Sequence, residues 1–371
     1  MYKNFNDELS WAILNMPRTN SAIDKLPNLD GIRLACSMHL DLKMAPVVLG
    51  LLKRGAKVFL TTCNPTTAQD DVVEYLKQQG AEAHAWNNMN DDDWITSFDK
   101  ALAWNPTHLC EMGGDLTSRI HEKNLDIQIK ASLEATGSGI SRLNKILNNN
   151  SPKYPIFNWD DLPVKEGLHN RHMVGLTAWH TFFQITHLTL HEKIVVVIGY
   201  GLVGQGVAAS AKAYGGQVII VETDKARALQ ARYDGWMVTD LTDALTKADV
   251  VATATGANNV LSKQHLVNTK DSIFILNVGH VANEIDVEFL KSFPHNEPMP
   301  FINAYQVNNK TIYLLANGSM LNLTAGYGDS LNAFDVTLAV IISGIEHIVK
   351  AGANQLSGLY LLPKSAWGNS L

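Results

Sequence analysis

The chain has 371 residues, of which 46% are hydrophobic and 18% are charged, and its formal net charge is -6. A single hydrophobic core stops growing at roughly 250–300 residues, so this length predicts two domains. Basic and acidic residues are interspersed, which argues against a nucleic-acid partner. The chain begins with polar residues, and no apolar run approaches the ~20 residues of a membrane-spanning helix. We therefore expect a cytoplasmic protein with no membrane partner.

Three cysteines and one histidine-rich stretch are the candidates for disulfide or metal chemistry. Cys36, Cys63 and Cys110 are odd in number, far apart and in apolar surroundings. This pattern predicts reduced core residues, not a disulfide framework or a CxxC metal site. The stretch from His180 to His187 lacks the spacing and the carboxylates of a zinc helix, so we expect no metal.

The first half of the chain alternates between strand and helix patterns. Short apolar strands are expected at residues 31–40, 56–64 and 106–115, with helices at 44–55 and 67–80 between them. Each strand ends in polar or glycine-rich residues. This pattern predicts a parallel α/β sheet whose strand tips present side chains.

A second alternating pattern starts near residue 193. Strands are expected at residues 193–201, 216–224, 235–240, 249–256 and 272–279, with helices between them. Five strand signals in such a short stretch are typical of a nucleotide-binding half. The expected fold class is therefore α/β with two Rossmann-like domains.

Two helical patterns flank this second half, at residues 177–193 and 330–349. We expect the first helix to cross between the domains. The second has an apolar face that needs a partner, and we expect it to return to the first domain. Two crossings predict a hinge between the domains and a ligand cleft.

A glycine-rich turn, VVVIGYGLVGQG at residues 195–206, follows the first strand of the second half. Gly199 suits a tight turn, Gly201 lets the backbone approach a pyrophosphate, and Gly204 allows close packing of helix on strand. The next strand ends in Glu222, whose carboxylate suits both ribose hydroxyls of NAD and repels the 2′-phosphate of NADP. We therefore predict a doubly wound, NAD-binding domain. Its expected cofactor contacts are Gly199, Gly201, Leu202, Val203, Gly204 and Glu222.

Further sequence blocks occur in an order that is typical of one enzyme family. They are SMHL at 37–40, CNPTTAQDD at 63–71, GGDLT at 113–117, EATGSG at 134–139, NVGHVANEID at 277–286, MLNL at 320–323 and YLLPKS at 360–365. With these blocks the whole chain resembles the adenosylhomocysteinase (S-adenosylhomocysteine hydrolase) family, as a divergent and C-terminally shortened member.

The resemblance implies a domain order and a partner. We expect a substrate-binding domain at residues 1–178, an inserted NAD-binding domain at 179–328, and a C-terminal helix and tail at 329–371 that return to the first domain. The implied substrate is a small nucleoside-type molecule. The family's tail, which carries a Lys and a Tyr into the neighbouring subunit's NAD site, extends beyond this sequence, so we expect weaker NAD retention. Apolar helical faces predict a homodimer or homotetramer.

The family chemistry explains why a hydrolase uses NAD. Oxidation of the ribose 3′-hydroxyl makes the 4′-hydrogen acidic, homocysteine is eliminated from C5′, water adds, and the 3′-ketone is reduced again. Such a site needs a group that takes the hydroxyl proton, a base for C4′ and a donor near C5′.

The resemblance also implies roles for individual residues. Lys165 matches the lysine that assists 3′-hydroxyl oxidation, and Asn158 and Asn170 match its flanking asparagines. His39 matches the histidine near C5′, and His280 matches the one beside the ribose and nicotinamide. Further implied cofactor contacts are Thr136, Gly137, Ser138, Asn170, Val278, Gly279, His280 and Asn322.

The chain departs from the family in the substrate site. Met112 stands where the family has the carboxylate that works at the 4′-carbon, and Ala135 stands where it has a second glutamate after Glu134. His169 replaces a ribose-binding aspartate. Because methionine cannot take a proton, we expect His169 to be the base, since histidine titrates near neutral pH. Glu111 is a second candidate, although adjacent residues of a strand face opposite sides.

The residues expected near the adenine also differ from those of the family. Asp41 and Lys43 replace a threonine and a glutamate that meet the base, and Asp329 replaces a histidine near it. Such polar changes can discriminate between substrates by ~10⁴. The expected catalytic residues are therefore His39, Lys165, His169, Asn170 and His280, and the expected substrate contacts are Asp41, Lys43, Met112, Asn158 and Asp329.

Three functions remain open on this sequence. The first is an NAD-dependent enzyme that oxidises the 3′-hydroxyl of a nucleoside or nucleoside thioether and then eliminates or hydrolyses at C5′. The second is an NAD-dependent dehydrogenase or epimerase of a ribose-like sugar or cyclitol alcohol without thioether cleavage. The third is a non-catalytic nucleotide-binding homologue.

Overall fold

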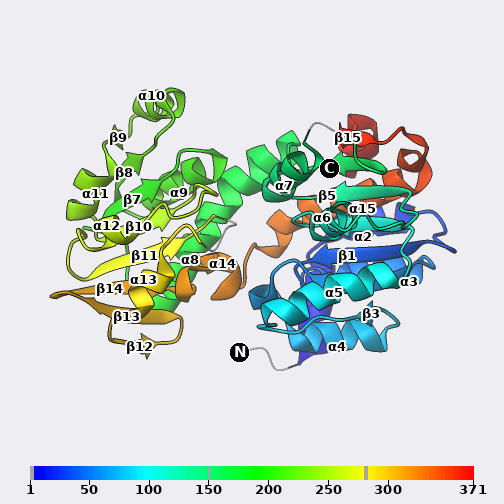
Figure 1. The fold of residues 1–371 in the computed structure, drawn as a ribbon, viewed down its shortest axis with the longest axis horizontal. Helices are drawn as coiled ribbons and strands as arrows, with labels where there is room; N and C mark the ends of the chain where they lie inside the picture. The colour runs from blue at the N-terminus through cyan, green and yellow to red at the C-terminus, as the bar shows by residue number, and fades with distance from the viewer. Residues whose placement is uncertain (1–3, 149–150, 280–282) are drawn as a thin grey trace. The chain divides into compact units, whose positions relative to one another are not determined.

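The computed structural model describes residues 4–148, 151–279 and 283–371 and consists of two compact units. Unit 1 is formed by the chain up to Lys165 and again from Leu331 onward, and unit 2 by Glu166–Ser330. The chain therefore crosses between the units after residues 165 and 330. The domain boundaries expected from the sequence were residues 178 and 328. Each unit contains one sheet flanked by helices (Figure 1), so the expected α/β fold with two Rossmann-like domains is confirmed.

Unit 1 is built on a seven-stranded parallel sheet. Its strands are β1 Arg33–Met38, β2 Lys57–Thr62, β3 Glu82–Ala83, β4 His108–Glu111, β5 Ala131–Glu134, β6 Pro155–Asn158 and β15 Gly358–Leu361. They lie in the order β3-β2-β1-β4-β5-β6-β15, so the strand order reverses direction between β1 and β4. At such a switch point the loops after two neighbouring strands run to opposite faces and leave a crevice for a ligand.

Helices cover both faces of this sheet. Leu34 and Cys36 of β1 belong to one buried cluster, and Ala35 between them belongs to another, as expected for alternating side chains of a strand. The helical segments are α1 Phe5–Leu14, α2 Pro17–Lys25, α3 Ala45–Lys53, η1 Pro65–Thr67, α4 Asp70–Gln78, α5 Asp91–Ala103, α6 Asp115–Glu122, α7 Gly137–Leu147, α15 Leu331–Lys350, η4 Gly352–Asn354, α16 Lys364–Trp367 and η5 Gly368–Ser370.

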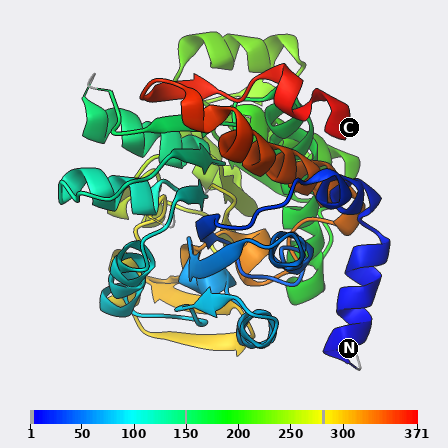
Figure 2. The same ribbon diagram turned by 90° about the vertical axis from the view of Figure 1, so that its right-hand side faces the viewer.

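The last long helix, α15, returns to unit 1, as the sequence predicted. Helix α2 has no side-chain cap of its own, and Asp335 of α15 accepts hydrogen bonds from the backbone N–H groups of Arg18 and Thr19 at 3.0 and 2.8 Å. A carboxylate at a helix N-terminus satisfies donors that have no intrahelical partner. Figure 2 shows α15, in orange-red, between the blue N-terminal helices and the red C-terminal segment.

Helix α15 is long and apolar enough to span a membrane by length and composition alone. However, 61% of its most apolar window is buried inside the structure. It packs on α2, β5 and α16, all of which belong to unit 1. We therefore interpret it as a core helix of this unit.

Unit 2 contains an eight-stranded sheet with the order β9-β8-β7-β10-β11-β14-β13-β12. The strands are β7 Ile194–Ile198, β8 Gln217–Val221, β9 Met237–Val238, β10 Val250–Thr253, β11 Ile273–Asn277, β12 His295–Met299, β13 Ile302–Val307 and β14 Lys310–Leu315. The strands from β9 to β14 in this spatial order, namely β9, β8, β7, β10, β11 and β14, are parallel. Strands β13 and β12 add an antiparallel edge that the sequence pattern did not predict. The switch point lies between β7 and β10.

The helical segments of unit 2 lie between these strands and before them. They are η2 Lys165–Met173, which begins at the boundary, α8 Val174–Thr186, α9 Leu202–Ala213, α10 Lys225–Tyr233, α11 Leu241–Lys247, α12 Lys263–Leu266, α13 Val287–Lys291, η3 Ala316–Gly318 and α14 Leu321–Thr324. The expected helix over 177–193 was too long. It ends at Thr186 because His187 adopts a left-handed conformation, with a φ of 57°.

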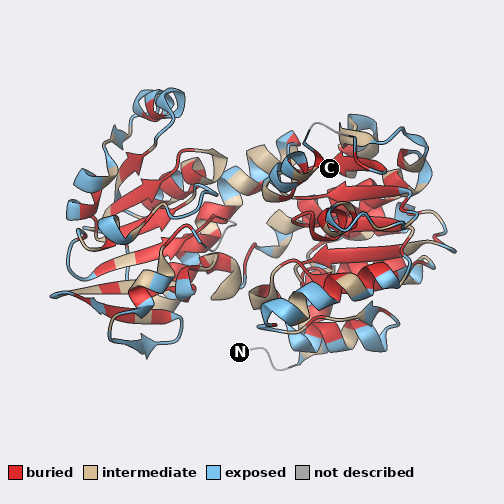
Figure 3. Ribbon diagram, viewed as in Figure 1, coloured by how far each residue is buried: buried red, intermediate tan, exposed pale blue. Residues whose placement is uncertain are grey.

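The cores of both units lie along their sheets. Figure 3 shows most strand residues in red, as buried, and the outward sides of α5 and α10 largely in pale blue, as exposed. Cys36, Cys63 and Cys110 are buried and not in disulfides, as the sequence predicted.

Candidate functional site

The glycine turn of unit 2 directly follows β7 at the switch point. Gly199 has a φ of +98°, and a Cβ at Gly204 would lie 2.0 Å from the Gly199 carbonyl oxygen, so helix and turn touch through backbone. A Cβ at Gly201 would lie 3.8 Å from the nearest atom, in Arg227. Open space at Gly201 and the start of α9 at Leu202 are the features that an approaching pyrophosphate requires.

Glu222 follows β8 and is fixed beside this turn. Its carboxylate accepts hydrogen bonds from the backbone N–H groups of Tyr200, at 2.7 Å, and Asp224, at 2.9 Å. Each oxygen thus has one backbone donor and retains acceptor capacity. This arrangement suits the two hydroxyls of an adenosine ribose, as the sequence predicted.

Tyr200 of the turn forms hydrogen bonds with Asp234 and Trp236, and the sequence analysis missed these contacts. The Tyr200 hydroxyl donates to Asp234 at 2.8 Å and accepts from the Trp236 indole N–H at 2.6 Å. Burial, followed by the hydrogen bond to Asp234, raises the pKa of Tyr200, so its hydroxyl remains a donor. Only the Tyr in the glycine motif was visible in the sequence, because its partners lie 34 and 36 residues away.

The loops after β10 and β11 are held by Glu284. This fully buried carboxylate accepts from the Thr255 N–H and hydroxyl and from the Gly256 N–H, the last at 2.7 Å. A Cβ at Gly279 would lie 1.9 Å from Glu284 Oε1, so only glycine fits there. Val278 and Gly279, two expected cofactor contacts, thus lie on a constrained segment, and His280 lies outside the described residues.

Asn322 on α14 provides a test of whether NAD fits this unit. Its side chain is buried, and its Nδ2 donates to Thr177 Oγ1 at 3.2 Å. Within the described residues its Oδ1 is buried without a hydrogen-bond partner. A buried acceptor of this kind requires a donor. The carboxamide N–H₂ of nicotinamide is such a donor, so the unit fits NAD at both ends.

The switch point of unit 1 places His39 after β1 and Met112 after β4. Thr67 Oγ1 donates to the Asn64 carbonyl at 2.8 Å and lies 2.8 Å from His39 Nδ1. The Thr67 hydroxyl thus contacts His39 through Nδ1 and orients the imidazole ring. Met112 follows β4 and is buried, and its thioether cannot take a proton as a carboxylate would.

Asp41 and Lys43 form an ion pair with each other. Lys43 Nζ lies 2.8 Å from Asp41 Oδ2, and the Lys43 side chain is only 4% exposed. Asp41 Oδ1 also accepts from the Met44 N–H at 3.2 Å. The two residues expected at the base are therefore an internally compensated pair.

A buried carboxylate, Glu134, organises the loops after β4 and β5. It accepts hydrogen bonds from the backbone N–H groups of Gly113, Gly114 and Thr136 and from the Thr136 hydroxyl, at 2.7 to 2.9 Å. Burial, together with the negative charge of Glu111, raises the pKa of Glu134 to about 8 despite these donors. The Thr136 hydroxyl in turn accepts from Ser138 Oγ at 3.2 Å, so the expected nicotinamide segment is ordered by Glu134.

Glu111 is the partner of Glu134 on the neighbouring strand. It accepts from the Leu116 and Thr117 N–H groups at 2.7 and 3.1 Å, from the Thr117 hydroxyl, and from Ser132 Oγ at 3.3 Å. Burial raises the pKa of Glu111 to about 7. Its oxygens are engaged by the first turn of α6, so its geometry is that of a loop anchor rather than a base for a ligand.

Lys165 lies next to a carboxylate that the sequence analysis missed. Its Nζ is 3.5 Å from Asp160 Oδ1, and both side chains are mostly buried. A Cβ at Gly137 would lie 3.0 Å from Asp160 Oδ2, which brings the expected segment 136–138 next to this pair. Asn158 accepts from the Asp160 N–H at 2.9 Å and donates to Asp161 at 2.6 Å, so it shapes the loop that carries Lys165.

His169 and Asn170 lie on η2, a π-helical segment, which is a rare conformation often found at functional sites. His169 Nε2 is 3.5 Å from Asp329 Oδ2, and both residues are less than 10% exposed. The structure thus brings together two expected site residues that are far apart in the sequence.

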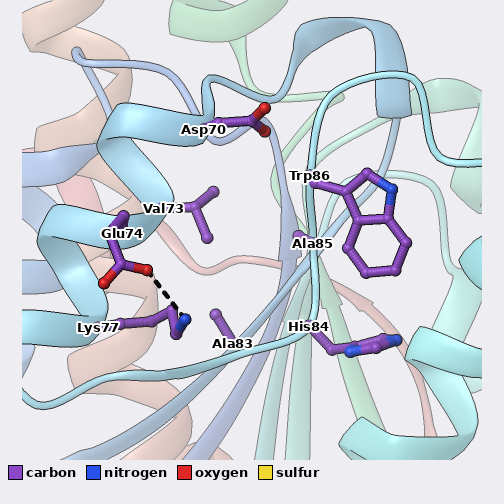
Figure 4. Close-up of a pocket in the computed structure, with 8 residues that line it drawn as sticks. All are labelled: Asp70, Val73, Glu74, Lys77, Ala83, His84, Ala85 and Trp86. Carbon is purple, nitrogen blue, oxygen red and sulfur yellow. Dashed lines mark hydrogen bonds and ion pairs between the residues drawn. The ribbon is translucent and has the colours of Figure 1, made fainter.

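A separate surface depression of about 310 Å³ lies between α4 and the β3 edge of unit 1. Figure 4 shows Trp86 and His84 on one side of it and the Glu74–Lys77 ion pair, 3.0 Å long, on the other. None of the expected site residues lines it, so it is distinct from the candidate site.

Comparisons with known proteins give matches in both units. A family model described as S-adenosyl-L-homocysteine hydrolase matches residues 8–132, and a model of that enzyme's NAD binding domain matches residues 180–328. An S-inosyl-L-homocysteine hydrolase of Methanopyrus kandleri is 30% identical, with 96% of this chain and 87% of that protein covered. Adenosylhomocysteinases of Sulfolobus acidocaldarius and Thermotoga maritima are 33% and 31% identical, with 96% of this chain and 87% and 90% of those proteins covered.

A solved crystal structure of a dipicolinate synthase chain from Bacillus halodurans is similar in fold. Its TM-score is 0.51 at 13% identity, with 86% of this chain and 99% of that chain covered. At this identity the likeness concerns the fold alone.

Proposed function

The chain belongs to the S-adenosyl-L-homocysteine hydrolase family, and from this premise we propose that it hydrolyses a nucleoside thioether of the S-adenosylhomocysteine type with NAD as its cofactor. The observation that supports the proposal is that unit 2 contains the glycine turn, Glu222 and the buried Asn322 amide, while unit 1 contains Lys165 and His39 in the loops that follow its strands. The products are a thiol amino acid and a nucleoside.

Unit 2 would hold NAD through its turn, its ribose carboxylate and a buried amide. Gly201 and the N-terminus of α9 suit the pyrophosphate, Glu222 suits the adenosine ribose, and Asn322 suits the carboxamide. When bound, NAD removes a hydride from a sugar carbon and later returns it. Glu284 keeps the flanking loops in place.

Unit 1 supplies groups for binding and proton transfer. Lys165, held beside Asp160, is suited to exchange a proton with the 3′-hydroxyl, because an ammonium next to a carboxylate can donate and recover protons over a short distance. His39, whose ring is oriented through Nδ1 by the Thr67 hydroxyl, is suited to take a proton from water at C5′ or to give one to the departing thiol.

The purine is the part of the substrate that the proposal leaves to experiment. The relatives include hydrolases named for adenosyl and for inosyl substrates. The Asp41–Lys43 pair offers one acceptor and one donor, and the edges of a 6-amino and a 6-oxo purine can each pair with such a set. Purified enzyme should therefore be assayed with both thioethers side by side.

The test is release of a free thiol from S-adenosylhomocysteine and from S-inosylhomocysteine, combined with mass spectrometry of molecules released on denaturation. We expect NAD or NADH in the denatured sample and thiol release from at least one thioether. Oxidation of a sugar without thiol release would favour the dehydrogenase alternative. Protein that neither contains nor binds NAD would contradict the proposal and leave a binding role.

A further inference from the structure

Strand β3 forms one edge of the sheet in unit 1, and its outer side has no partner strand among the described residues. The N–H of His84, directly after the strand, donates to the Leu60 carbonyl of β2 at 3.0 Å. Neighbouring residues of an extended chain direct their backbone groups to opposite sides. The N–H and C=O groups of Ala83 and Ala85 are therefore directed away from β2. No described residue supplies a hydrogen bond to these groups.

The surface depression of about 310 Å³ between α4 and β3 lies along this edge. It is lined by Val73 of α4 and by the small side chains of Ala83 and Ala85. Figure 4 shows Val73 on one side of Ala85 and the rings of His84 and Trp86 on the other. A strand added at this edge directs every second side chain to the face of the two alanines. The edge thus offers both backbone pairing and space for aliphatic side chains.

Carboxylates lie at both ends of this edge. Asp70, the first residue of α4, lies at the end near Trp86 (Figure 4), and Glu82 is the exposed first residue of β3. Within the described residues neither carboxylate forms an ion pair, and the Glu74–Lys77 pair between them compensates its own charges. A peptide with a basic residue at each end is therefore complementary in charge, and the Trp86 ring adds a face for a cation.

We propose that the β3 edge of unit 1 is a docking site for an extended peptide segment whose residues are basic, aliphatic, polar, aliphatic and basic in turn. The segment adds an antiparallel strand to the sheet through the backbone groups of Ala83 and Ala85. Its aliphatic side chains lie opposite these alanines, against Val73. Its basic side chains lie opposite Glu82 and Trp86. The docking site shares no residue with the cofactor and substrate contacts and does not rest on the proposed function.

The test uses the full-length protein and the peptide fluorescein-Lys-Val-Thr-Val-Lys-amide. Fluorescence polarisation measures its binding, and amide hydrogen exchange locates it. We expect saturable binding that weakens as salt is added, with slower exchange at Ala83 and Ala85. N-methylation of both valines removes the two donors that face β3 and should weaken binding at least ~10-fold. A peptide with glutamate in place of both lysines should also bind at least ~10-fold more weakly.

The variant A83P removes an outward N–H of this edge and leaves the pairing with β2 in place, because β2 does not use that N–H. We expect at least ~5-fold weaker peptide binding and a melting temperature close to that of the wild type. The matched control is L361P in β15, the opposite edge of the same sheet. The next N–H, of Leu362, donates to the Asn158 carbonyl, so L361P also removes an outward donor but should leave peptide binding unchanged.

Absence of saturable binding would overturn the proposal, as would equal binding of the N-methylated peptide or equal binding by A83P. The N-methylated peptide decides the question without a change in the protein, and therefore also if A83P does not fold. Self-association of the protein that A83P abolishes, without peptide binding, would assign the edge to a second copy of the chain and contradict the peptide site. Thiol release and NADH formation test the proposed function separately from all these outcomes.

Discussion

The two switch points of this protein use different means to prepare a site. In unit 2 the turn after β7 is built from backbone: Gly199, Gly201 and Gly204 leave space, and Glu222 and Asn322 still have acceptor capacity. In unit 1 the polar side chains at the strand ends mostly contact one another or their own loops. A cofactor of constant shape can be bound by backbone groups, whereas a substrate is recognised by side chains that must first be oriented.

The largest expected effect concerns the backbone-built site. G201A places a methyl group where the pyrophosphate approaches, in a position that is open in the protein itself. Steric displacement and lost hydrogen bonds to a charged group together cost about 4 kcal/mol, a ~1000-fold rise in the Kd for NAD. Titration calorimetry measures this rise, and the melting temperature of the cofactor-free protein should stay unchanged.

G204A is the matched variant for this prediction. Its Cβ would overlap the Gly199 carbonyl oxygen, so we expect it to lower the stability of the cofactor-free protein as well as NAD affinity. If G201A and G204A destabilise the cofactor-free protein equally, the assignment of open space at Gly201 is wrong.

The second prediction concerns side chains of unit 1 that compensate each other. K43M leaves the mostly buried Asp41 carboxylate without its ammonium partner, and breaking such a pair costs about 3 kcal/mol or more. In D41N/K43M both charges are gone, and the loss should be about 1 kcal/mol. Denaturant titration of the two single variants and the double variant measures the coupling. Additive losses would show that the pair is not coupled in solution.

The third prediction returns to unit 2. E222Q removes the charge and turns one oxygen, which accepts from a backbone N–H, into an N–H₂ group. Hydrogen bonds to charged groups exceed neutral ones by about 1–1.5 kcal/mol. We therefore expect ~10-fold weaker NAD binding and stronger NADP binding than in the wild type, because repulsion of the 2′-phosphate is lost. Competition between the two cofactors measures the change, and an unchanged NADP affinity would contradict this role of Glu222.

Much of the fold and the NAD site followed from local sequence patterns. β-Branched runs indicated the strands of both sheets, and the GxGxxG spacing with Glu222 described a turn whose geometry the structure contains. Strands β12 to β14 escaped prediction, since the exposed strand His295–Met299 has no apolar alternation. The helix over 177–193 was predicted too long, because no glycine marks its end at His187.

The other expected site residues could be predicted only in part, because their contacts join distant segments. Nothing local to Asp329 indicates that it faces His169, and nothing local to Asp160 indicates its contact with Lys165. Matched position by position with the family, Asp41 and Lys43 are two separate changes, whereas the structure shows one pair. Residue types at a site are therefore more accessible from sequence than the partners that orient them.

The last prediction concerns Glu134, the anchor of the loops in unit 1. In E134Q an N–H₂ group replaces the carboxyl O–H that is present at pH 7, and it adds a second donor that faces a backbone donor of the same loop, such as the Gly114 N–H. An unsatisfied buried donor of this kind costs about 1–2 kcal/mol of unfolding free energy. Thermal and denaturant unfolding at pH 7 measure this loss. The matched variant is E122Q at the exposed end of α6, which should change the stability little.

The pH dependence of the stability difference between the wild type and E134Q tests the same carboxyl group. The pKa of Glu134, about 8 in the folded protein, lies above the ordinary value of 4.5, so the folded state holds the proton to higher pH than the unfolded chain. The stability contribution of Glu134 is therefore complete below pH 4.5 and is lost as pH rises toward 8. Because glutamine does not titrate, the E134Q variant should lose less stability than the wild type between about pH 5 and 8. A constant difference between the two proteins over this window would mean that Glu134 is ionised throughout, held by its donors alone, and that burial does not dominate its pKa.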